Sequence, residues 1–575
     1  MLRRIFSYMK EYKKYAWLAL ICIGVEVVLE IMVPKLMADL IDIGVTNSDV
    51  PYIINKGIQM AVCAVAALIL GVGSARFSAL AGQGLGANIR KAEYEKLQSY
   101  SFSNIDHFSV SSLVTRLTSD VTNIQNAVST GMRPFGRSPV MLIFATTLAF
   151  QINSTLALVF LVALPVLAVM LIIIIINVGP RYGRMQGAVD LVNRCIEENL
   201  TAVRVVKSYV RGDYEIEKFR NVNDNLKNES EKAFGIAVLN MPAMQFVMYS
   251  TILGILLIGG RLINSGQMMI GQLTSFLSYV LLILNSLMMM SNVFLLMTRS
   301  LASAERIMKV IDEPIDITDE NAKDIEVKKG EIEFNHVWFK YKDTAKEYVL
   351  SDVSFHINAG QTVGIIGQTG SSKTTLIQLI PRLYDASKGE IKIDGINVKE
   401  YPVRHLRDAI SVVLQKNTLF SGSLIDNLRW GDENATLDEI KEACSIACVD
   451  EFIDRLPGGF DAEMGQEGVN VSGGQKQRIC IARAILKKPK VLILDDSTSA
   501  VDTATEGKIK NALAKKLPDM TKIIIAQRIS SVCQADQIII MDGGRVDAIG
   551  THESLLRTNK IYQEIYESQK EGADL

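Results

Sequence analysis

Val363-Gly-Ile-Ile-Gly367-Gln-Thr-Gly370-Ser-Ser-Lys373-Thr374-Thr375 sets the fold of the carboxyl-terminal half of this 575-residue chain. Its opening apolar run predicts a buried strand, and the apolar stretch after Thr375 predicts a helix, with a glycine-containing loop between them. Backbone N–H groups of such a loop, together with the start of the helix, can surround phosphate groups. We therefore expect a nucleotide site in which Lys373 contacts the β- and γ-phosphates and the Thr374 hydroxyl ligates Mg²⁺.

One position of this loop departs from the usual pattern, because Ser372 stands where the motif has its last glycine. A side chain there can crowd the loop or force a less favourable backbone geometry. We expect phosphate binding to persist with reduced affinity. The residues expected to surround the nucleotide are Gly367, Gln368, Thr369, Gly370, Ser371, Ser372, Lys373, Thr374 and Thr375.

A second apolar strand is predicted at Val491–Leu494, and it runs into the acidic pair Asp495-Asp496. Asp495 is expected to hold a water-coordinated Mg²⁺. An ATP-hydrolysing enzyme would carry glutamate at the next position, where the carboxylate orients or deprotonates the attacking water. The Asp496 side chain is shorter by one C–C bond, about 1.5 Å. The sequence therefore predicts ATP binding more strongly than ATP hydrolysis.

Between these two motifs lies a third, Val471-Ser472-Gly473-Gly474-Gln475, which precedes the apolar helix expected at Ile479–Leu486. A serine and two glycines at the start of a helix can form a second anion site. The phosphate loop of the same chain cannot reach this site. We therefore expect it to act on nucleotide that is held by a partner chain.

The amino-terminal half has a different character, because long charge-poor apolar stretches alternate with charged helical sequence. A membrane-spanning helix needs about 20 apolar residues, and six runs qualify. The runs are Ala16–Leu36, Ile58–Ala81, Arg137–Ile152, Leu156–Val178, Met241–Gly260 and Gly271–Met297.

The whole chain has a net charge of −1, which gives no bulk basic field. No nucleic-acid partner is therefore expected.

Basic residues concentrate in the long connections between the second and third spans and between the fourth and fifth, which favours a cytoplasmic location for those connections. The predicted protein is a multi-pass cell-membrane protein with its amino terminus and nucleotide-binding domain in the cytoplasm. Its fold is a six-span helical domain with long cytoplasmic extensions, joined to an α/β phosphate-loop domain with a helical subdomain. The expected parts are an amphipathic interfacial helix (1–15), a transmembrane domain (16–300), a linker (301–330) and a nucleotide-binding domain (331–575).

Two acidic side chains lie in the first span, at Glu26 and Glu30 on one helix face. Ionisable groups inside a membrane usually face a cavity or a partner. One interpretation is that they line the transport pathway and attract cationic cargo; the other is that they lie near the interface or pair internally, for example with Arg76. In the sixth span, Met288 belongs to a methionine cluster that suits a pocket accepting many shapes. For any single methionine, ordinary packing or contact with lipid is the better explanation, and only the cluster supports the pocket.

The seven cysteines are scattered and odd in number, so no disulfide framework is predicted. Cys444 and Cys448 lie one helical turn apart. We expect them to be two small buried residues rather than a reactive or metal-binding pair.

These motifs, in this order, resemble the ATP-binding cassette (ABC) family, and specifically exporters with six spans fused to one cassette. The resemblance implies that Tyr341 stacks on adenine, that Gln415 contacts Mg²⁺ and the attacking water, and that Asp502 ends a loop communicating between two ATP sites. The family carries a histidine at the γ-phosphate where this chain has Gln527. A neutral amide can donate a hydrogen bond but is not an ionisable switch.

Asp496 and Gln527 together indicate a site that binds ATP and hydrolyses it slowly or not at all. Because Ser472–Gln475 is intact, the chain resembles the degenerate-site subunit of a heterodimeric bacterial multidrug exporter, whose partner would supply the catalytic glutamate. The expected cargo is a small amphiphilic or drug-like compound. The alternatives are a homodimeric lipid or peptide exporter and an ATP-gated regulator or channel. Segments 109–120 and 208–213 are the candidates for docking the membrane domain to the cassettes.

Overall fold

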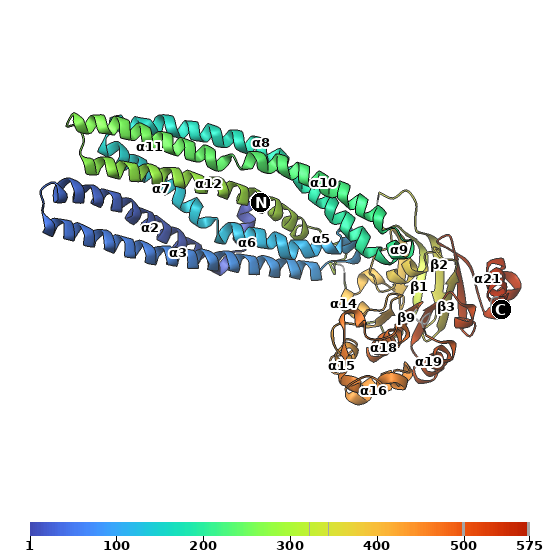
Figure 1. The fold of residues 1–575 in the computed structure, drawn as a ribbon. Helices are drawn as coiled ribbons and strands as arrows, with labels where there is room; N and C mark the ends of the chain where they lie inside the picture. Colours follow the sequence, from blue (N-terminus) through green and yellow to red (C-terminus); the bar gives the residue numbers. More distant parts are fainter. Residues whose placement is uncertain (321, 343, 497–500, 572–575) are drawn as a thin grey trace. The chain divides into compact units, whose positions relative to one another are not determined.

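The computed structural model describes residues 1–320, 322–342, 344–496 and 501–571. The chain forms two compact units. The first comprises Met1–Gln98 and Val110–Glu313, and the second comprises Ser99–Ser109 and Pro314–Leu575. Figure 1 shows that the first unit is built from long helices and that the second contains the β-sheets.

Helices make up the regular structure of the first unit in the described part of the chain. Its short 3₁₀ and π segments are η1 (Lys10–Tyr12), η2 (Leu40–Val45) and η3 (Arg116–Asp120). Its α-helices are α1 (Leu2–Ser7), α2 (Lys13–Asp39), α3 (Val50–Gln98), α5 (Val110–Thr115), α6 (Val121–Ser129), α7 (Met132–Ile152), α8 (Ser154–Thr201), α9 (Val203–Ser208), α10 (Gly212–Ala237), α11 (Asn240–Asn264) and α12 (Ile270–Ile311).

The six predicted spans lie within six of these helices, α2, α3, α7, α8, α11 and α12. Helix α3 has 49 residues and α8 has 48, so both extend well beyond a bilayer core of about 30 Å. Two shorter apolar stretches, Ser154–Met170 and Ile270–Ser286, begin α8 and α12. By length and composition, four helical stretches among the described residues could cross a membrane: Lys10–Val45, Val50–Gln98, Val110–Ile152 and Gly212–Asn264.

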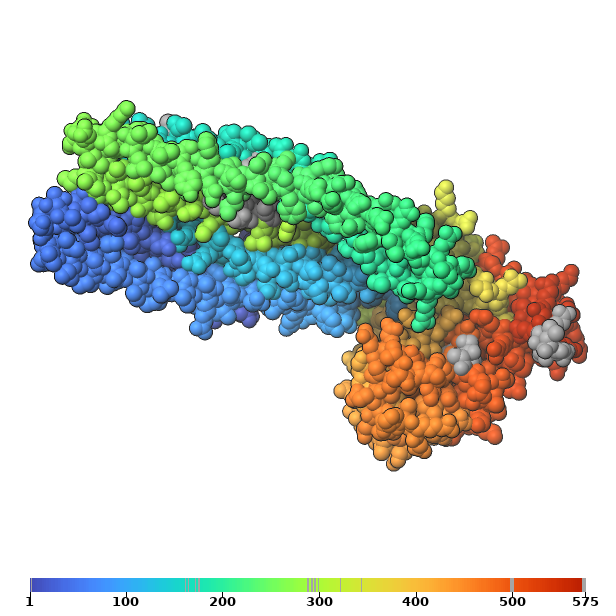
Figure 2. Space-filling model, viewed as in Figure 1, coloured from blue at the N-terminus to red at the C-terminus, as the bar shows by residue number. Residues whose placement is uncertain are grey.

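Large apolar side chains remain exposed along these helices, as membrane-facing helices require. Ile69 on α3 is 65% exposed and Leu257 on α11 is 70% exposed. Figure 2 shows the side chains of α3 in blue and those of α10 and α11 in green along one surface of the unit. The exposed apolar side chains of α3 and α11 fit contact with lipid, whereas α10 is rich in charged residues.

The interior of the first unit is closed by contacts between α2, α7, α8, α11 and α12. Phe160 and Phe276 stack with ring centroids 5.4 Å apart. The hydroxyl of Tyr279 donates to the carbonyl of Ile31 at 3.0 Å, and Ser275 donates to the carbonyl of Pro34. These buried hydroxyl groups are satisfied by the backbone of α2, which fixes α12 against it.

The amino-terminal segment differs from the single surface helix expected over residues 1–15. It forms α1, η1 and the first turn of α2. Ile5 and Met9 are buried against α3, α6 and α12, and Arg4 donates to both carboxylate oxygens of Asp312 at 2.9 and 2.6 Å. Ile5 of α1 is therefore covered by neighbouring helices, whereas Phe6 of the same helix is 42% exposed.

Two sheets form the framework of the second unit. The six-stranded sheet has the order β12-β11-β3-β10-β9-β6, and the four-stranded sheet has the order β2-β1-β4-β5. Strands β11, β3, β10, β9 and β6 are parallel, and β12 is antiparallel to β11. The strands are β1 (Ile332–Phe339), β2 (Leu350–Ile357), β3 (Thr362–Gly367), β4 (Lys388–Ile393), β5 (Ile396–Asn397), β6 (Ile410–Val413), β9 (Val491–Asp495), β10 (Thr521–Ile525), β11 (Gln537–Asp542) and β12 (Arg545–Gly550), with a separate pair β7 (Gly422–Ser423) and β8 (Glu463–Met464).

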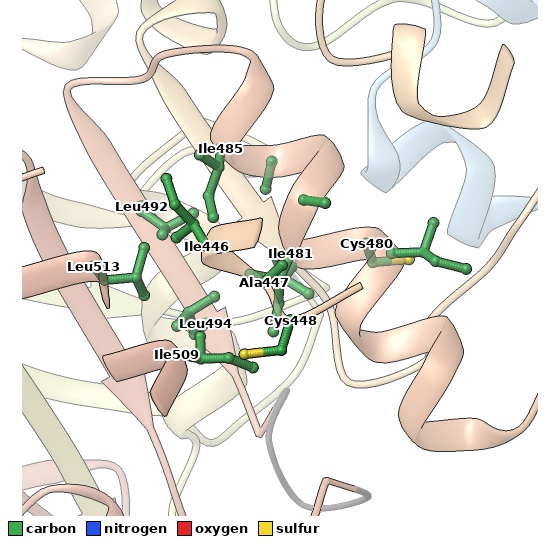
Figure 3. Packing of buried hydrophobic residues seen from close by; sticks show 14 of the residues in the cluster. Ile446, Ala447, Cys448, Cys480, Ile481, Ile485, Leu492, Leu494, Ile509 and Leu513 are labelled. Atoms are coloured by element: carbon green, nitrogen blue, oxygen red, sulfur yellow. The ribbon is translucent and has the colours of Figure 1, made fainter. Parts of the chain in front are cut away.

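Helices cover these sheets and build a separate helical region. Figure 3 shows part of the core that joins this region to β9 and α19, with Ile446, Ile481 and Leu494 packed together. Cys444, Cys448 and Cys480 are buried free thiols in the same core, as expected for Cys444 and Cys448. The helices are α13 (Lys373–Leu379), α14 (Val403–Asp408), α15 (Leu424–Arg429), α16 (Leu437–Ile446), α17 (Asp450–Ile453), α18 (Gly473–Leu486), α19 (Thr503–Lys516), α20 (His552–Thr558) and α21 (Lys560–Glu571), with 3₁₀ segments η4 (Val398–Glu400), η5 (Gly459–Asp461), η6 (Gln466–Gly468) and η7 (Ile529–Ser531).

A short segment from the first half of the sequence belongs to the second unit. Helix α4 (Phe102–His107) starts with a capping box between Ser101 and Asn104. The hydroxyl of Tyr384 donates to Asp106 at 2.6 Å, and the Phe102 ring lies 6.1 Å from the Tyr384 ring. The part of the chain that packs with the cassette is thus 99–109, which ends where the first docking segment that we predicted begins. That predicted segment, 109–120, forms mainly α5 and η3 of the first unit.

Candidate ATP-binding site

The candidate site lies at the carboxyl-terminal ends of the parallel strands. Strand β3 leads into the phosphate loop, β9 ends at Asp495, β10 precedes Gln527, and β6 precedes Gln415. Parallel strands bring their carboxyl ends to one edge of a sheet, where ligands of open α/β sheets bind. A pocket of about 340 Å³ forms there, and its lining consists of Thr369, Gly370, Ser372, Lys373, Thr374, Thr375, Gln415, Asp495, Asp496, Ile525 and Gln527.

Lys373 is held inside the phosphate loop by the loop itself. Its ammonium group donates to the carbonyls of Gly367 at 2.8 Å and Gln368 at 2.9 Å, and contacts the Ser371 hydroxyl at 3.3 Å. Burial lowers the pKa of Lys373, and the neighbouring Asp495 and Asp496 partly oppose that shift. Phosphate oxygens are stronger partners for an ammonium group than carbonyls are, so the arrangement suits an incoming polyphosphate.

Ser372 occupies the left-handed region of backbone conformation, with φ of 68° and ψ of 24°. A residue with a β-carbon is disfavoured there, whereas glycine is not. Its side chain makes no capping hydrogen bond to α13. The position therefore keeps the geometry of a glycine while carrying a serine.

Asp495 and Thr374 could hold a magnesium ion beside the phosphates. The Thr374 hydroxyl donates to Asp495 Oδ1 at 3.3 Å, and the other carboxylate oxygen, Oδ2, is buried without a hydrogen-bond partner among the described residues. Burial raises the pKa of Asp495, and the Asp496 carboxylate adds to that shift. A free buried carboxylate oxygen, a hydroxyl and the Gln415 amide are the hard oxygen donors that Mg²⁺ uses.

Further ligands for such an ion would have to be phosphates and water. Within the described ranges, no group of three His, Cys, Asp or Glu side chains is placed to hold a metal ion. Sites in which Mg²⁺ binds together with nucleotide phosphates typically use one or two protein carboxylates.

Asp496 is engaged by two amide side chains. Gln527 Nε2 donates to Asp496 Oδ2 at 3.0 Å, and the Gln415 side chain also hydrogen-bonds to Asp496. Burial raises the pKa of Asp496, while Lys373 and these amides oppose the shift. The Asp496 backbone has a φ of 48°, which is strained for a residue other than glycine. Hydrogen bonds from Gln527 and Gln415, which also line the pocket, therefore hold the Asp496 carboxylate in place.

Tyr341 lies at the entrance to the α13 helix. Its hydroxyl is 2.9 Å from the Thr375 hydroxyl, and its ring packs edge-on against Phe339 and Tyr384, with centroids 4.9 and 5.2 Å away. The residue is 44% exposed, so an aromatic face remains available for a base.

The signature segment is not part of this pocket. Ser472 is the N-cap of α18: its hydroxyl accepts from the Gln475 backbone N–H at 3.3 Å, and Gln475 Oε1 accepts from the Ser472 N–H at 2.8 Å. Ser472 and Gly473 are exposed, and Gly474 is half-buried. Asp502 caps α19 by accepting from the Thr505 N–H at 2.9 Å, and this backbone bond is the main cause of the lowered pKa of Asp502.

Sequence reasoning also named residues in the first unit, and there the structure supplies partners that it missed. Arg133 Nη2 donates to Glu26 at 2.6 Å, and Arg137 Nη1 donates to Glu30 at 3.0 Å. These partners replace Arg76, which we had considered. A signal was available, because Arg133 and Arg137 are four residues apart, like the two glutamates. Met288 lies on α12, but its side chain lies outside the described part of the structure.

Comparisons with known proteins agree with this architecture. Residues 16–287 match the family model of the ABC transporter transmembrane region, and residues 350–499 match that of the ABC transporter. The solved structure of a bacterial Atm1-family ABC exporter with ATP bound superimposes with a TM-score of 0.84 at 22% identity, covering 97% of this chain and 99% of that chain. This likeness confirms the fold expected from the sequence.

Relatives extend over the whole chain. The Bacillus subtilis protein YfiB, an uncharacterised ABC transporter ATP-binding protein, is 37% identical over 100% of both chains. The ATP-dependent lipid A-core flippase of Pseudomonas putida is 32% identical over 98% of this chain and 95% of its own. A further Bacillus subtilis relative, YgaD, whose name proposes multidrug export, is 31% identical over 84% of this chain and 83% of its own. The chain therefore belongs to the ABC transporter family, as a multi-pass exporter half-transporter that joins one transmembrane region to one ATP-binding cassette.

Proposed function

We propose that this half-transporter is the degenerate-site subunit of a heterodimer that uses ATP to move amphiphilic or drug-like compounds out of the cytoplasm. The observation that carries the proposal is the short, hydrogen-bonded side chain of Asp496. Its carboxylate is one bond shorter than that of glutamate and accepts a hydrogen bond from Gln527 at 3.0 Å. Such a carboxylate is poorly placed to accept a proton from water at the γ-phosphate.

The nucleotide-binding residues have complementary tasks. Lys373 exchanges its loop carbonyls for phosphate oxygens, Tyr341 stacks on the adenine, and Thr374, Asp495 and Gln415 hold Mg²⁺. When bound, this ion neutralises charge on the phosphates. Gln527 contributes a neutral hydrogen-bond donor at the γ-phosphate. The ATP site formed by the phosphate loop of this chain therefore binds ATP but hydrolyses it little.

The signature segment supports the second half of the proposal. Ser472 and Gly473 are exposed at the start of α18, whose 14 residues give a well-formed helix terminus. Free N–H groups at such a terminus favour a phosphate group. We assign Ser472, Gly473, Gly474 and Gln475 to the nucleotide of the partner, with Asp502 communicating between the two sites.

Transport then follows from the cassettes. Cargo enters the membrane domain from the cytoplasmic side, ATP draws the two cassettes together and the cavity opens outward. Hydrolysis at the partner's site resets the cycle. Names of relatives that mention a lipid A-core flippase and multidrug export support an amphiphilic cargo.

The test is the ATPase activity of this chain alone and together with a second half-transporter that carries the catalytic glutamate, each reconstituted in lipid. We expect low activity alone and strong activity in the mixture, with uphill movement of a dye into inverted vesicles. Full activity of the chain alone would indicate a homodimer and refute the degenerate site. Dye movement that merely follows a gradient would indicate an ATP-gated channel.

A further inference from the structure

We propose that the cavity in the first unit binds the head group of an anionic amphiphile, with Arg133 as the residue that recognises its charge. The inference rests on the proposed function, because it names the cargo class of the same export pathway. The cavity has a volume of about 790 Å³. That size lies within the range of about 300–1,000 Å³ that is typical of small-molecule sites.

The acidic residues of this cavity are already occupied. Glu26 has a side chain that is 4% exposed, and it accepts from Arg133 at 2.6 Å, from Arg137 at 3.5 Å and from the Ser74 hydroxyl at 3.4 Å. Glu30 forms an ion pair with Arg137, in which Glu30 Oε2 lies 2.5 Å from Arg137 Nη2. A cationic ligand would have to displace an arginine from a carboxylate in order to use either charge. The two glutamates therefore do not present an open site for a cation.

Arg133 is the charge that remains accessible. Its side chain is 43% exposed and lines the cavity. In the described part of the structure, Arg133 donates one hydrogen bond, from Nη2 to Glu26. A guanidinium group has five N–H donors, so most of them remain for a ligand, and their planar arrangement matches carboxylate or phosphate oxygens. An anionic head can therefore bind without breaking the existing ion pairs.

The walls of the cavity explain why the ligand would be an amphiphile. Around the charged cluster the lining is mainly aliphatic, and it comes from α2, α3 and α12. Apolar walls favour a hydrocarbon chain, whereas a small inorganic anion would leave them exposed to water. The aliphatic lining comprises Val33, Pro34, Ala64, Ala67, Leu68, Val72, Ala75, Leu281 and Leu282.

The experiment is an equilibrium titration of the full chain, purified with its partner where one is required, in lipid nanodiscs without ATP. Three fluorescent probes share one tail: 11-(dansylamino)undecanoic acid, its methyl ester and a trimethylammonium analogue. We expect the acid to bind about tenfold more tightly than the ester, which is the scale of one charge-assisted hydrogen bond. Arg133→Gln should remove this preference, Arg133→Lys should retain part of it, and Arg261→Gln, an exposed arginine outside the cavity lining, should leave it unchanged.

Several outcomes would overturn the inference. Tightest binding of the cationic probe would do so, as would equal effects of Arg133→Gln and Arg261→Gln. If Arg133→Gln does not give a monodisperse protein, Ala67→Trp fills the cavity without changing its charge and should weaken binding of all three probes; undiminished binding would exclude this cavity. Because the titration needs no ATP, ATP-driven transport without anion preference would refute the inference alone. Arg133-dependent binding without transport would refute the proposed function alone.

Discussion

The phosphate loop and the signature segment of the cassette each place a serine at the start of a helix, Ser372 and Ser472, but the two serines differ in backbone geometry. Ser372 precedes α13 with a φ of 68° and makes no side-chain cap. Ser472 precedes α18 with a φ of −69° and forms a capping box with Gln475. The first serine is strained where glycine would be relaxed, whereas the second is a preferred N-cap residue in its preferred geometry. Serine is thus disfavoured at the start of α13 and favoured at the start of α18.

The same contrast extends to the residues around each serine. The phosphate-loop site combines Ser372 with Asp496 and Gln527, and each differs from the residue that hydrolysis favours. The signature quartet Ser472–Gln475 has no such departure. If the two regions serve different ATP molecules, changes in them should have unequal effects on the activity of the assembled transporter.

The largest effect is expected from Gly473→Asp in the signature. Aspartate is favourable in the first turn of a helix, so α18 should fold, while its carboxylate repels the phosphate group expected there. We expect the ATPase activity of the assembled transporter to fall by about a hundredfold or more, comparable to the loss of an oxyanion donor. Asp496→Asn in the same chain is the matched control. It should change the activity by less than about twofold, because Asp496 is not expected to act as the general base. The reverse ranking would place the active hydrolysis site in this chain.

A smaller effect is expected from restoring the catalytic residues. Asp496→Glu alone should leave ATPase activity nearly unchanged, because Gln527 still lacks an ionisable ring. The double change Asp496→Glu with Gln527→His should raise it by about tenfold or more, within the range of general acid–base catalysis. The measurement uses an assembly whose partner site has been disabled, so that the activity of this site is isolated. Full recovery with Asp496→Glu alone would show that Gln527 is not limiting.

The Ser372→Gly change should have a still smaller effect, and on binding rather than on turnover. Removing a β-carbon from a left-handed position relieves about 1 kcal/mol of strain, which corresponds to about fivefold in affinity if the strain is released in the nucleotide-bound loop. Ser472→Gly should change the stability of α18 by a few tenths of a kcal/mol, because glycine is a tolerated N-cap. Titration with a fluorescent ATP analogue measures the first, and thermal unfolding measures the second. No gain in affinity for Ser372→Gly would show that the loop already tolerates serine.

Sequence patterns predicted the parts of this protein that depend on local order. Apolar run length predicted helices such as α2 and α3, and the strand-loop-helix pattern around Lys373 predicted β3 and α13. Sequence patterns could not predict the contacts that depend on how the helices pack against one another. Glu26 and Arg133 are 107 residues apart in sequence and meet because α2 packs against α7. The Tyr384–Asp106 bond, with a separation of 278 residues, likewise depends on which segment joins the second unit.

The weakest contrast between the two regions is expected in their pH dependence. Burial raises the pKa of Asp495 and lowers that of Lys373, whereas Ser472–Gln475 contains no ionisable side chain. In the nucleotide-free protein, the raised pKa of Asp495 makes the folded state bind a proton more readily than the unfolded chain. Its contribution to stability is therefore largest at low pH and falls as the pH rises through that pKa.

Magnesium competes with this proton. The affinity of the own site for Mg²⁺·ATP should therefore decrease on acidification, starting at a higher pH than for an ordinary aspartate, while the affinity for ATP in EDTA should change less. On the alkaline side both affinities should fall as Lys373 loses its proton, earlier than for an ordinary lysine. Titrations between about pH 4 and pH 10, just inside the ordinary pKa values of aspartate and lysine, check both arms. A flat acid arm for Mg²⁺·ATP would mean that the buried Asp495 oxygen does not hold the metal, and the case for a retained but idle nucleotide would then rest on Lys373 and the loop backbone.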